Sequence, residues 1–175
     1  MHIIEKSITS AYWKPTQDYL RRRINTNRFR EVGVEGVLEV FGGKYIRSYV
    51  ICDGWEPIGW VYLRRRKTWV AWEVSQTFVI KEYRGNRYAE LLYRTAINDG
   101  GVLLASGCSH TKFSKGLWKK FIKDNAFDIW AQDFKNHNSY AQVIYEDGEL
   151  HCAIPLYHNV WDKYDVRLIA QGKRK

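Results

Sequence analysis

Helical and strand-like hydrophobic patterns follow one another along the chain. Lys14-Pro15 predicts a helix start, because proline is favoured in the first helical turn, and apolar residues then recur at helical spacing as far as Ile24. Stretches rich in Val, Ile, Trp and Tyr predict three strands, over 44–52, 58–63 and 68–80. Short charged or glycine-containing turns join these strands, which indicates an antiparallel meander.

The second half of the chain alternates strands with helices. A helix that follows residues 84–89 ends at Gly100-Gly101, and another helix runs through 113–122. Further strands are predicted over 102–105, 128–131, 140–146 and 149–154, the last two joined by an Asp147-Gly148 turn. We therefore predict one mixed α/β domain over residues 1–175, with a central mixed sheet, a meander followed by β-α-β units, and helices on both faces.

The composition is that of a folded protein, with 45% hydrophobic, 27% charged and 15% aromatic residues. Lys and Arg number 28 against 19 Asp and Glu, and the net charge of +9 favours an anionic partner such as a nucleic acid, a phosphorylated cofactor or an acidic protein surface. No apolar run approaches ~18 residues and no signal peptide is evident, so we expect a cytoplasmic protein with no membrane partner. The three cysteines lack metal-site or redox spacing, so we expect no structural metal.

The strongest candidate for chemistry is the passage from a buried strand into a helix at residues 77–92. An Arg-Gly loop connects the two, and the first amides of the helix have no partners within the helix. Such a junction can hold a pyrophosphate, with Gly85 allowing close backbone approach and Arg84 and Arg87 adding positive charge. The alternative is a plain structural turn.

In this context the sequence resembles the GNAT superfamily of N-acetyltransferases. The family signature, Gln/Arg-x-x-Gly-x-Gly/Ala, is similar to Arg84, Gly85, Asn86, Arg87, Tyr88 and Ala89, except that Arg87 replaces the middle glycine. The resemblance implies acetyl-CoA as cofactor, lying where the central strand and its neighbour splay, with its pyrophosphate on the 84–89 turn. It also implies that backbone amides of Phe78, Val79 and Ile80 face the acetyl carbonyl; the alternative for these three is core strand.

A second stretch looks like a pattern in phage-encoded GNAT-like proteins. Ser106, Thr111 and Leu117-Trp118 match that pattern, and Gly107 replaces its acidic residue. This resemblance adds Thr111 to the expected cofactor-binding residues. A phage origin would place the protein in the cytoplasm of a host bacterium.

The resemblance also suggests how catalysis would proceed. Family members often keep a glutamate base on the central strand, and Glu73 occupies that strand here; the alternative is a surface glutamate paired with a neighbouring arginine. Trp118 stands in the helix where the family has a tyrosine acid, and indole cannot protonate a thiolate. Ser106, Ser109 and His110, on the loop after the short strand, are the candidate substitutes, and a surface-loop histidine is the alternative for His110.

The leading hypothesis is an acetyl-CoA-dependent N-acyltransferase that acts on an amine of a host protein or of a small molecule. A second hypothesis is an enzyme of the same fold that modifies DNA or RNA bases, since the positive charge and abundant aromatics suit a nucleic acid. A third is an inactive GNAT-like protein that binds and inhibits a host macromolecule. Basic clusters recur in separate elements, and whether they converge on one face is left open.

Overall fold

The computed structural model describes residues 8–65, 67, 70–98, 102–106, 112–133, 140–146, 149–152 and 166–173. The chain forms two compact units, one made of Met1–Leu63 and Gln76–Thr95 and the other of Arg64–Ser75 and Ala96–Lys175. None of the helices in the described ranges is long and apolar enough to cross a bilayer.

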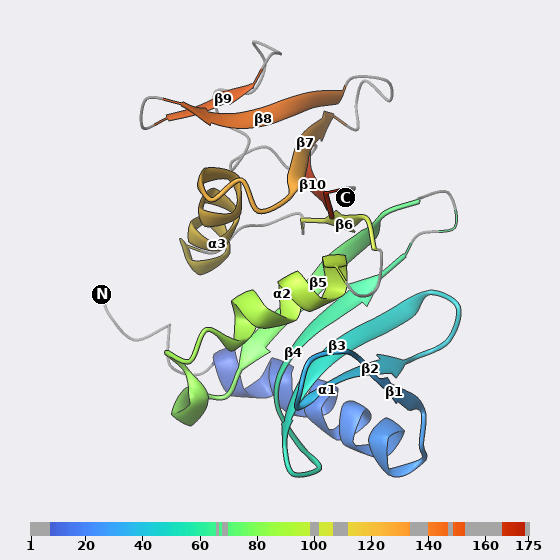
Figure 1. Cartoon of the computed structure of the whole chain (residues 1–175). Coiled ribbons are helices and arrows are strands. Elements are labelled where there is room, and N and C mark those ends of the chain that lie inside the picture. Colours follow the sequence, from blue (N-terminus) through green and yellow to red (C-terminus); the bar gives the residue numbers. More distant parts are fainter. Residues whose placement is uncertain are drawn as a thin grey trace. The chain divides into compact units, whose positions relative to one another are not determined.

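The first unit is built on an antiparallel meander (Figure 1). Its strands are hydrogen-bonded in chain order, and β2 runs antiparallel to both β1 and β3. The predicted meander is confirmed, and two strands that the sequence did not predict precede it. The elements are α1 (Ile8–Asn25), β1 (Phe29–Glu31), β2 (Val37–Phe41), β3 (Ile46–Asp53), β4 (Glu56–Arg64) and β5 (Trp72–Val79). The first half of β5, as far as Ser75, is assigned to the second unit.

The predicted start of the first helix is wrong. Helix α1 begins at Ile8, and Pro15 lies inside it rather than in its first turn. An interior proline costs a helix about 3 kcal/mol relative to alanine. The helix continues upstream of Pro15 because the Trp13 ring stacks on the Phe78 ring of β5, with centroids 5.2 Å apart. Tertiary packing therefore overrides the local preference on which the sequence prediction relied.

Helices lie on both faces of the meander, as predicted. Trp60 of β4 and Phe78 of β5 pack in the core cluster that includes Leu20 of α1. The neighbouring residue Thr77 makes a hydrogen bond with Tyr93 of α2 (Tyr88–Asn98), at 2.9 Å between their hydroxyl oxygens. Because successive side chains of a strand point to opposite faces, α1 and α2 cover opposite faces of β5.

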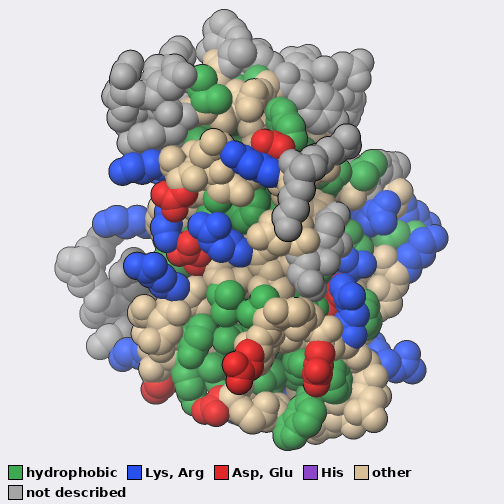
Figure 2. Space-filling view, viewed as in Figure 1, with side chains coloured by type: hydrophobic (Ala, Val, Ile, Leu, Met, Phe, Trp, Pro, Cys, Tyr) green, Lys and Arg blue, Asp and Glu red, His purple; other side chains and the backbone are tan. Residues whose placement is uncertain are grey.

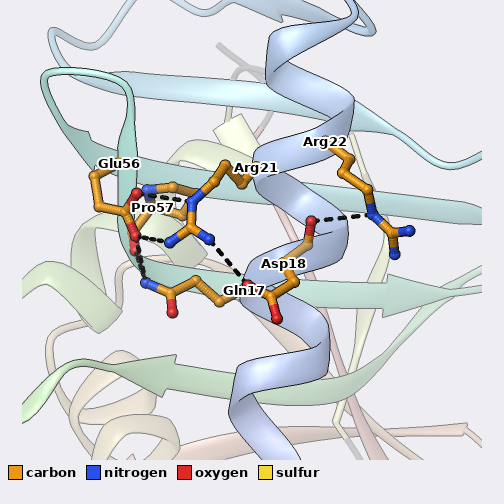
Figure 3. Close-up of polar contacts among 6 residues, drawn as sticks. All are labelled: Gln17, Asp18, Arg21, Arg22, Glu56 and Pro57. Carbon is orange, nitrogen blue, oxygen red and sulfur yellow. Dashed lines mark hydrogen bonds and ion pairs between the residues drawn. The ribbon is translucent and has the colours of Figure 1, made fainter.

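A polar cluster fixes α1 on the start of β4 (Figure 3). The buried Gln17 amide donates to the Glu56 carboxylate at 2.8 Å and to the Pro57 carbonyl at 2.9 Å. Arg21 donates from Nε to the same carboxylate at 2.9 Å and from Nη1 to Asp18 at 2.9 Å. The hydrogen bond with Glu56 raises the pKa of Arg21. This cluster holds the helix in register on the sheet.

The second unit contains a mixed sheet. Strand β5 pairs with β6 in parallel, and the pairs β6–β10, β10–β7, β7–β8 and β8–β9 are antiparallel. The predicted mixed α/β class, with β-α-β units after the meander, is confirmed. Strand β10 was not predicted, and it lies between β6 and β7. The elements are β6 (Leu104–Ala105), α3 (Lys112–Lys123), β7 (Asp128–Asp133), β8 (Tyr140–Glu146), β9 (Glu149–Cys152) and β10 (Val166–Gln171).

Helix α3 presents one apolar face to the interior of the second unit. Leu117, Trp118, Phe121 and Ile122 are buried along that face. The Phe121 ring meets Trp118 and Phe127 edge to face, with centroids 6.2 and 5.1 Å away. The predicted turn at Asp147-Gly148 and the predicted helix stop at Gly100-Gly101 lie outside the described residues.

Candidate active site

The predicted cofactor turn lies in the first unit, between the end of β5 and the start of α2. A short 3-10 helix, η1 (Lys81–Tyr83), follows Ile80, and residues 84–87 then lead into α2. All four of these residues are exposed. The structure therefore brings the predicted residues Phe78 to Ala89 together in one strand–turn–helix segment.

Two residues of the turn have left-handed backbone conformations, Gly85 with φ +94° and Arg87 with φ +57°. A Cβ built on Gly85 would meet nothing within 4 Å, so the backbone, and not a lack of space, requires glycine there. Arg87 stands where the resembled signature has its middle glycine. The left-handed region costs a non-glycine residue roughly 1–2 kcal/mol, so Arg87 keeps a glycine-like conformation at some cost.

The first amides of α2 point out of the turn. The Leu91 amide donates to the Arg87 carbonyl at 3.0 Å, which makes Arg87 the N-cap of the helix. The amides of Tyr88, Ala89 and Glu90 precede Leu91 and have no acceptor within the helix. Together with the helix dipole, they favour negative charge at this end of α2.

Arg84 fastens the turn to the end of β5. Its Nε donates to the Val79 carbonyl at 2.9 Å, and its guanidinium carbon lies 5.7 Å from the centroid of the Phe78 ring. The Asn86 amide donates to the Tyr83 carbonyl at 3.2 Å. Arg84 therefore orients the turn, whereas Arg87 stands at the N-cap itself and is exposed.

The three predicted backbone donors of β5 are not equivalent. The Ile80 amide already donates to the Ile58 carbonyl of β4 at 2.9 Å. A connection as short as that between β4 and β5 makes the two strands antiparallel, and alternate amides of such a strand point to the same neighbour. The amide of Phe78 therefore shares the β4 side with that of Ile80, and the amide of Val79 points away from β4.

Phe78 is the centre of an aromatic group beneath the turn. Its ring stacks on Trp13 of α1 with an interplanar angle of 12°, and its centroid lies 5.1 Å from that of Trp60. The Trp60 indole nitrogen donates to Gln76 of β5 at 3.0 Å. The Phe78 side chain is thus a core residue of the strand, which is the alternative given above. Its backbone lies at the end of β5, where the turn begins.

Two further hydrogen bonds hold the segment, and sequence reasoning missed both. Burial raises the pKa of Tyr93 to about 12, so its phenol stays neutral while it pairs with Thr77. The Tyr83 hydroxyl donates to Asp53 at 2.7 Å, and this hydrogen bond raises the pKa of Tyr83. No local pattern marks these partners, because each pair joins separate elements.

The candidate base Glu73 lies in the second unit. It stands opposite Ala105 in the parallel β5–β6 register, and its side chain is 15% exposed. The guanidinium of Arg167, on β10, lies 3.8 Å from the Glu73 carboxylate and is 7% exposed. Glu73 therefore has an arginine neighbour, as the alternative proposed, and this neighbour is Arg167 of β10.

Ser106 is fully buried at the end of β6. Its hydroxyl accepts a hydrogen bond from the Leu168 amide at 3.0 Å, and its own amide donates to the Leu168 carbonyl at 2.7 Å. These bonds give Ser106 a structural role between β6 and β10. The other candidates of that loop, Ser109, His110 and Thr111, lie outside the described residues.

Comparisons with known proteins find distant structural similarity and no sequence match. No protein-family model and no curated protein matches the chain. A Bacteroides thetaiotaomicron protein assigned to the GNAT family of acetyltransferases is 15% identical, with a TM-score of 0.41 over 77% of this chain and 65% of that one. An IAA acetyltransferase from Bacillus cereus is 19% identical, with a TM-score of 0.40 over 74% of this chain and 79% of its own. The chain thus spans less than two thirds of the first protein.

Proposed function

We propose that this protein is an acetyl-CoA-dependent N-acyltransferase that holds the cofactor pyrophosphate on the turn between β5 and α2. The observation that supports this most directly is the backbone of the turn. Gly85 and Arg87 are left-handed, and the chain then enters α2 with three amides that lack helical acceptors and an exposed arginine at the N-cap. This is the arrangement expected at the position where the sequence resembles the GNAT signature.

The residues present fit the cofactor. Arg87 and the amides of Tyr88 and Ala89 would hold the pyrophosphate, while Arg84 keeps the turn against the Val79 carbonyl. When bound, acetyl-CoA supplies an acetyl group activated as a thioester. The Val79 amide, directed away from β4, would donate a hydrogen bond to the acetyl carbonyl. Glu73 would take the proton of the acceptor amine, and Arg167 would keep its carboxylate oriented.

Calorimetry with acetyl-CoA and with desulfo-CoA tests the pyrophosphate site. Arg87→Glu should weaken the binding of both by tenfold or more, because it places a carboxylate where the pyrophosphate would lie; tenfold corresponds to about 1.4 kcal/mol. Lys44→Glu is the matched control, since it makes the same charge change at an exposed residue outside the turn and should leave affinity unchanged. No binding by the unmodified protein, or equal affinity in Arg87→Glu, would refute the assignment.

A second measurement tests the base. Glu73→Gln should lower the acetylation rate by about 10²- to 10⁴-fold, the usual contribution of a positioned base, while acetyl-CoA affinity stays unchanged. Urea denaturation of the same variant separates catalysis from folding, because Glu73 also faces Arg167. A variant with full turnover would show that another group takes the proton. A variant with native stability and a slow rate is the expected result.

A further inference from the structure

Helix α3 has an apolar face and a basic face. Its apolar face, with Leu117, Trp118, Phe121 and Ile122, is buried in the second unit. At 3.6 residues per turn, Lys112, Lys119 and Lys123 fall on the opposite side and are exposed, whereas Lys115 and Lys120 lie at the borders of the apolar face and are half-buried. No acidic residue occurs between the first lysine and the last. In Figure 2, several Lys and Arg side chains lie in the region of α3, with acidic side chains between them.

The lysines form a regular row. Lys112, Lys115, Lys119 and Lys123 follow one another at intervals of three or four residues, which places neighbouring Cβ atoms about 5–6 Å apart. At 1.5 Å of rise per residue, the row extends over roughly 16 Å. A row of cations with this spacing complements a polymer with a regularly repeated negative charge, such as the phosphate backbone of a nucleic acid.

A glycine lies in the middle of the basic face. Gly116 is exposed, and a Cβ built on it would meet nothing within 4 Å, so packing does not require glycine there. Its backbone is helical and none of the left-handed residues is Gly116, so conformation does not require glycine either. Glycine destabilises the interior of a helix relative to alanine. Close approach of a ligand to the backbone is one use of a glycine at such a position.

The neighbourhood of Gly116 distinguishes between anionic partners. The apolar face of α3 is already buried, and one exposed apolar side chain, Phe113, is too little to anchor a helix in a lipid surface. Phe113, one turn before Gly116, is 63% exposed beside the lysines. An exposed aromatic ring next to a row of cations suits a nucleic acid, since its bases stack on aromatic rings while its phosphates contact lysines.

We propose that the basic face of α3 binds the sugar-phosphate backbone of a nucleic acid, with Gly116 as the point of closest approach and Phe113 as a platform for an unpaired base. The proposal goes beyond the acyltransferase function and uses residues of the second unit only. It assigns a single-stranded ligand as the preferred one, because a base has to be unstacked to reach Phe113.

Fluorescence anisotropy with a labelled single-stranded oligonucleotide and its duplex, over a series of salt concentrations, tests the charged row. Changing Lys112, Lys115, Lys119 and Lys123 to Gln should weaken single-strand binding by tenfold or more. The slope of log K against log salt should fall by about 3, at ~0.7 for each phosphate that the variant no longer neutralises. The matched control changes the exposed Lys14, Lys44, Lys67 and Lys173 to Gln, lowers the charge equally, and should weaken binding far less.

Three outcomes of this titration would overturn the proposal. One is no binding by the unmodified protein to either nucleic acid. Another is an equal loss of affinity in the two quadruple variants, which would show a diffuse effect of net charge. The third is equal affinity for polyglutamate at the same salt concentration, which would show a preference for any polyanion or acidic protein. Circular dichroism confirms that α3 stays folded, as expected because glutamine is a good helix former.

Variants that change no charge test the binding mode itself. Gly116→Ala should raise the melting temperature, and Gly116→Gln should weaken binding severalfold at an unchanged salt slope, because its side chain keeps the backbone away. Phe113→Ala should weaken single-strand binding at least fivefold and duplex binding less, as expected when a stacking platform is removed. Unchanged affinity in both Gly116→Gln and Phe113→Ala would overturn the proposed mode of binding. Acetyl-CoA affinity should be the same in all these variants, which separates this proposal from the acyltransferase assignment.

Discussion

Each arginine of the first unit and each lysine of α3 carries the same formal charge, but the two kinds of side chain differ in what they contact. Arg21 chelates the carboxylate of Glu56, at 2.9 Å from its Nε. Arg30 and Arg47 both pair with Glu39, whose side chain is 1% exposed, and the Arg47 contact is 2.9 Å long. The planar guanidinium suits these fixed pairs, and each one fastens a helix or strand of the meander.

Helix α3 carries its charge on flexible ammonium groups along one face, without an acid among them in the sequence. The buried apolar side of α3 holds the helix in place, and its exposed lysines add positive potential at the surface of the second unit. The difference teaches that the net charge of +9 does not identify a binding surface by itself. The arginines that pair with Glu39 and Glu56 stabilise the fold, and the exposed lysines of α3 are the cations that we propose to bind an anionic partner.

Removing the buried Trp118 ring of α3 should have the largest effect on stability. Trp118→Ala should cost about 3–5 kcal/mol of unfolding free energy, because Trp118 is buried in the interior of the second unit. Urea denaturation followed by circular dichroism measures the loss. The Lys112/Lys115/Lys119/Lys123 to Gln variant should lose less than ~1 kcal/mol in the same experiment. A comparable loss in both would mean that the lysines also hold the helix.

Removing the shared acid of the meander should have the next largest effect. Glu39→Gln should cost about 2–3 kcal/mol, since two arginines lose a buried partner while Arg30 stays half exposed. Glu56→Gln is the matched control, and it should cost about 1 kcal/mol because the Glu56 side chain is 45% exposed. Chemical denaturation at neutral pH compares them. If Glu56→Gln proved the more destabilising, the ranking of these pairs by burial would be wrong.

The stability of the protein at alkaline pH tests the environment of Tyr49, which lies beside Glu39 and its arginines. Burial, with Glu39 nearby, raises the pKa of Tyr49 from 10.0 to about 12. The folded state therefore keeps its proton longer than the unfolded state, and the stability from the neutral phenol is present below pH 10 and lost between pH 10 and 12. Unfolding free energies measured across this range should fall, and Tyr49→Phe should reduce the fall. An equally steep fall in that variant would assign the loss to other tyrosines, such as Tyr93.

The smallest effect concerns the left-handed arginine of the candidate turn. Arg87→Gly and Arg87→Ala both remove the cation, but only glycine relieves the strain of φ +57°. The glycine variant should therefore be more stable than the alanine variant by about 1 kcal/mol. Both should bind acetyl-CoA more weakly than the unmodified protein. Equal stabilities would show that the turn relaxes when the side chain is shortened.

The local sequence pattern predicted most of the helices and strands. It failed for elements whose position depends on contacts with residues far away in the sequence. The strands β3 to β5 and the helices α2 and α3 carry clear periods or turn signals, so their existence followed from the sequence. Strand β1 has only three residues, too few for a period. Strand β10 pairs with β6 and β7 from far along the chain, and no local signal records that insertion. The start of α1 depended on Trp13 packing on Phe78.

The candidate site shows the same division. Its turn could be located from Arg84-Gly85 after a buried strand, because that signal is local. The sequence could not tell that Arg84 is tied to the Val79 carbonyl or that the Ile80 amide is already used by β4. Glu73 was recognised as either a base or an ion-pair member, and its arginine neighbour on β10 became evident only in the folded chain.

The position of β10 has a consequence for how the protein is made. Each strand of the meander pairs with the strand synthesised just before it, whereas β10 joins β6 and β7, which leave the ribosome much earlier. All residues of the first unit have emerged once Thr95 is synthesised, and a unit whose residues are complete can begin to fold during synthesis. Until Val166–Gln171 emerges, β6 and β7 expose unpaired edges of the kind that other chains and chaperones capture. The nascent chain thus passes through a stage in which the first unit has all its strands. At that stage the second unit still lacks β10, the strand that joins β6 to β7.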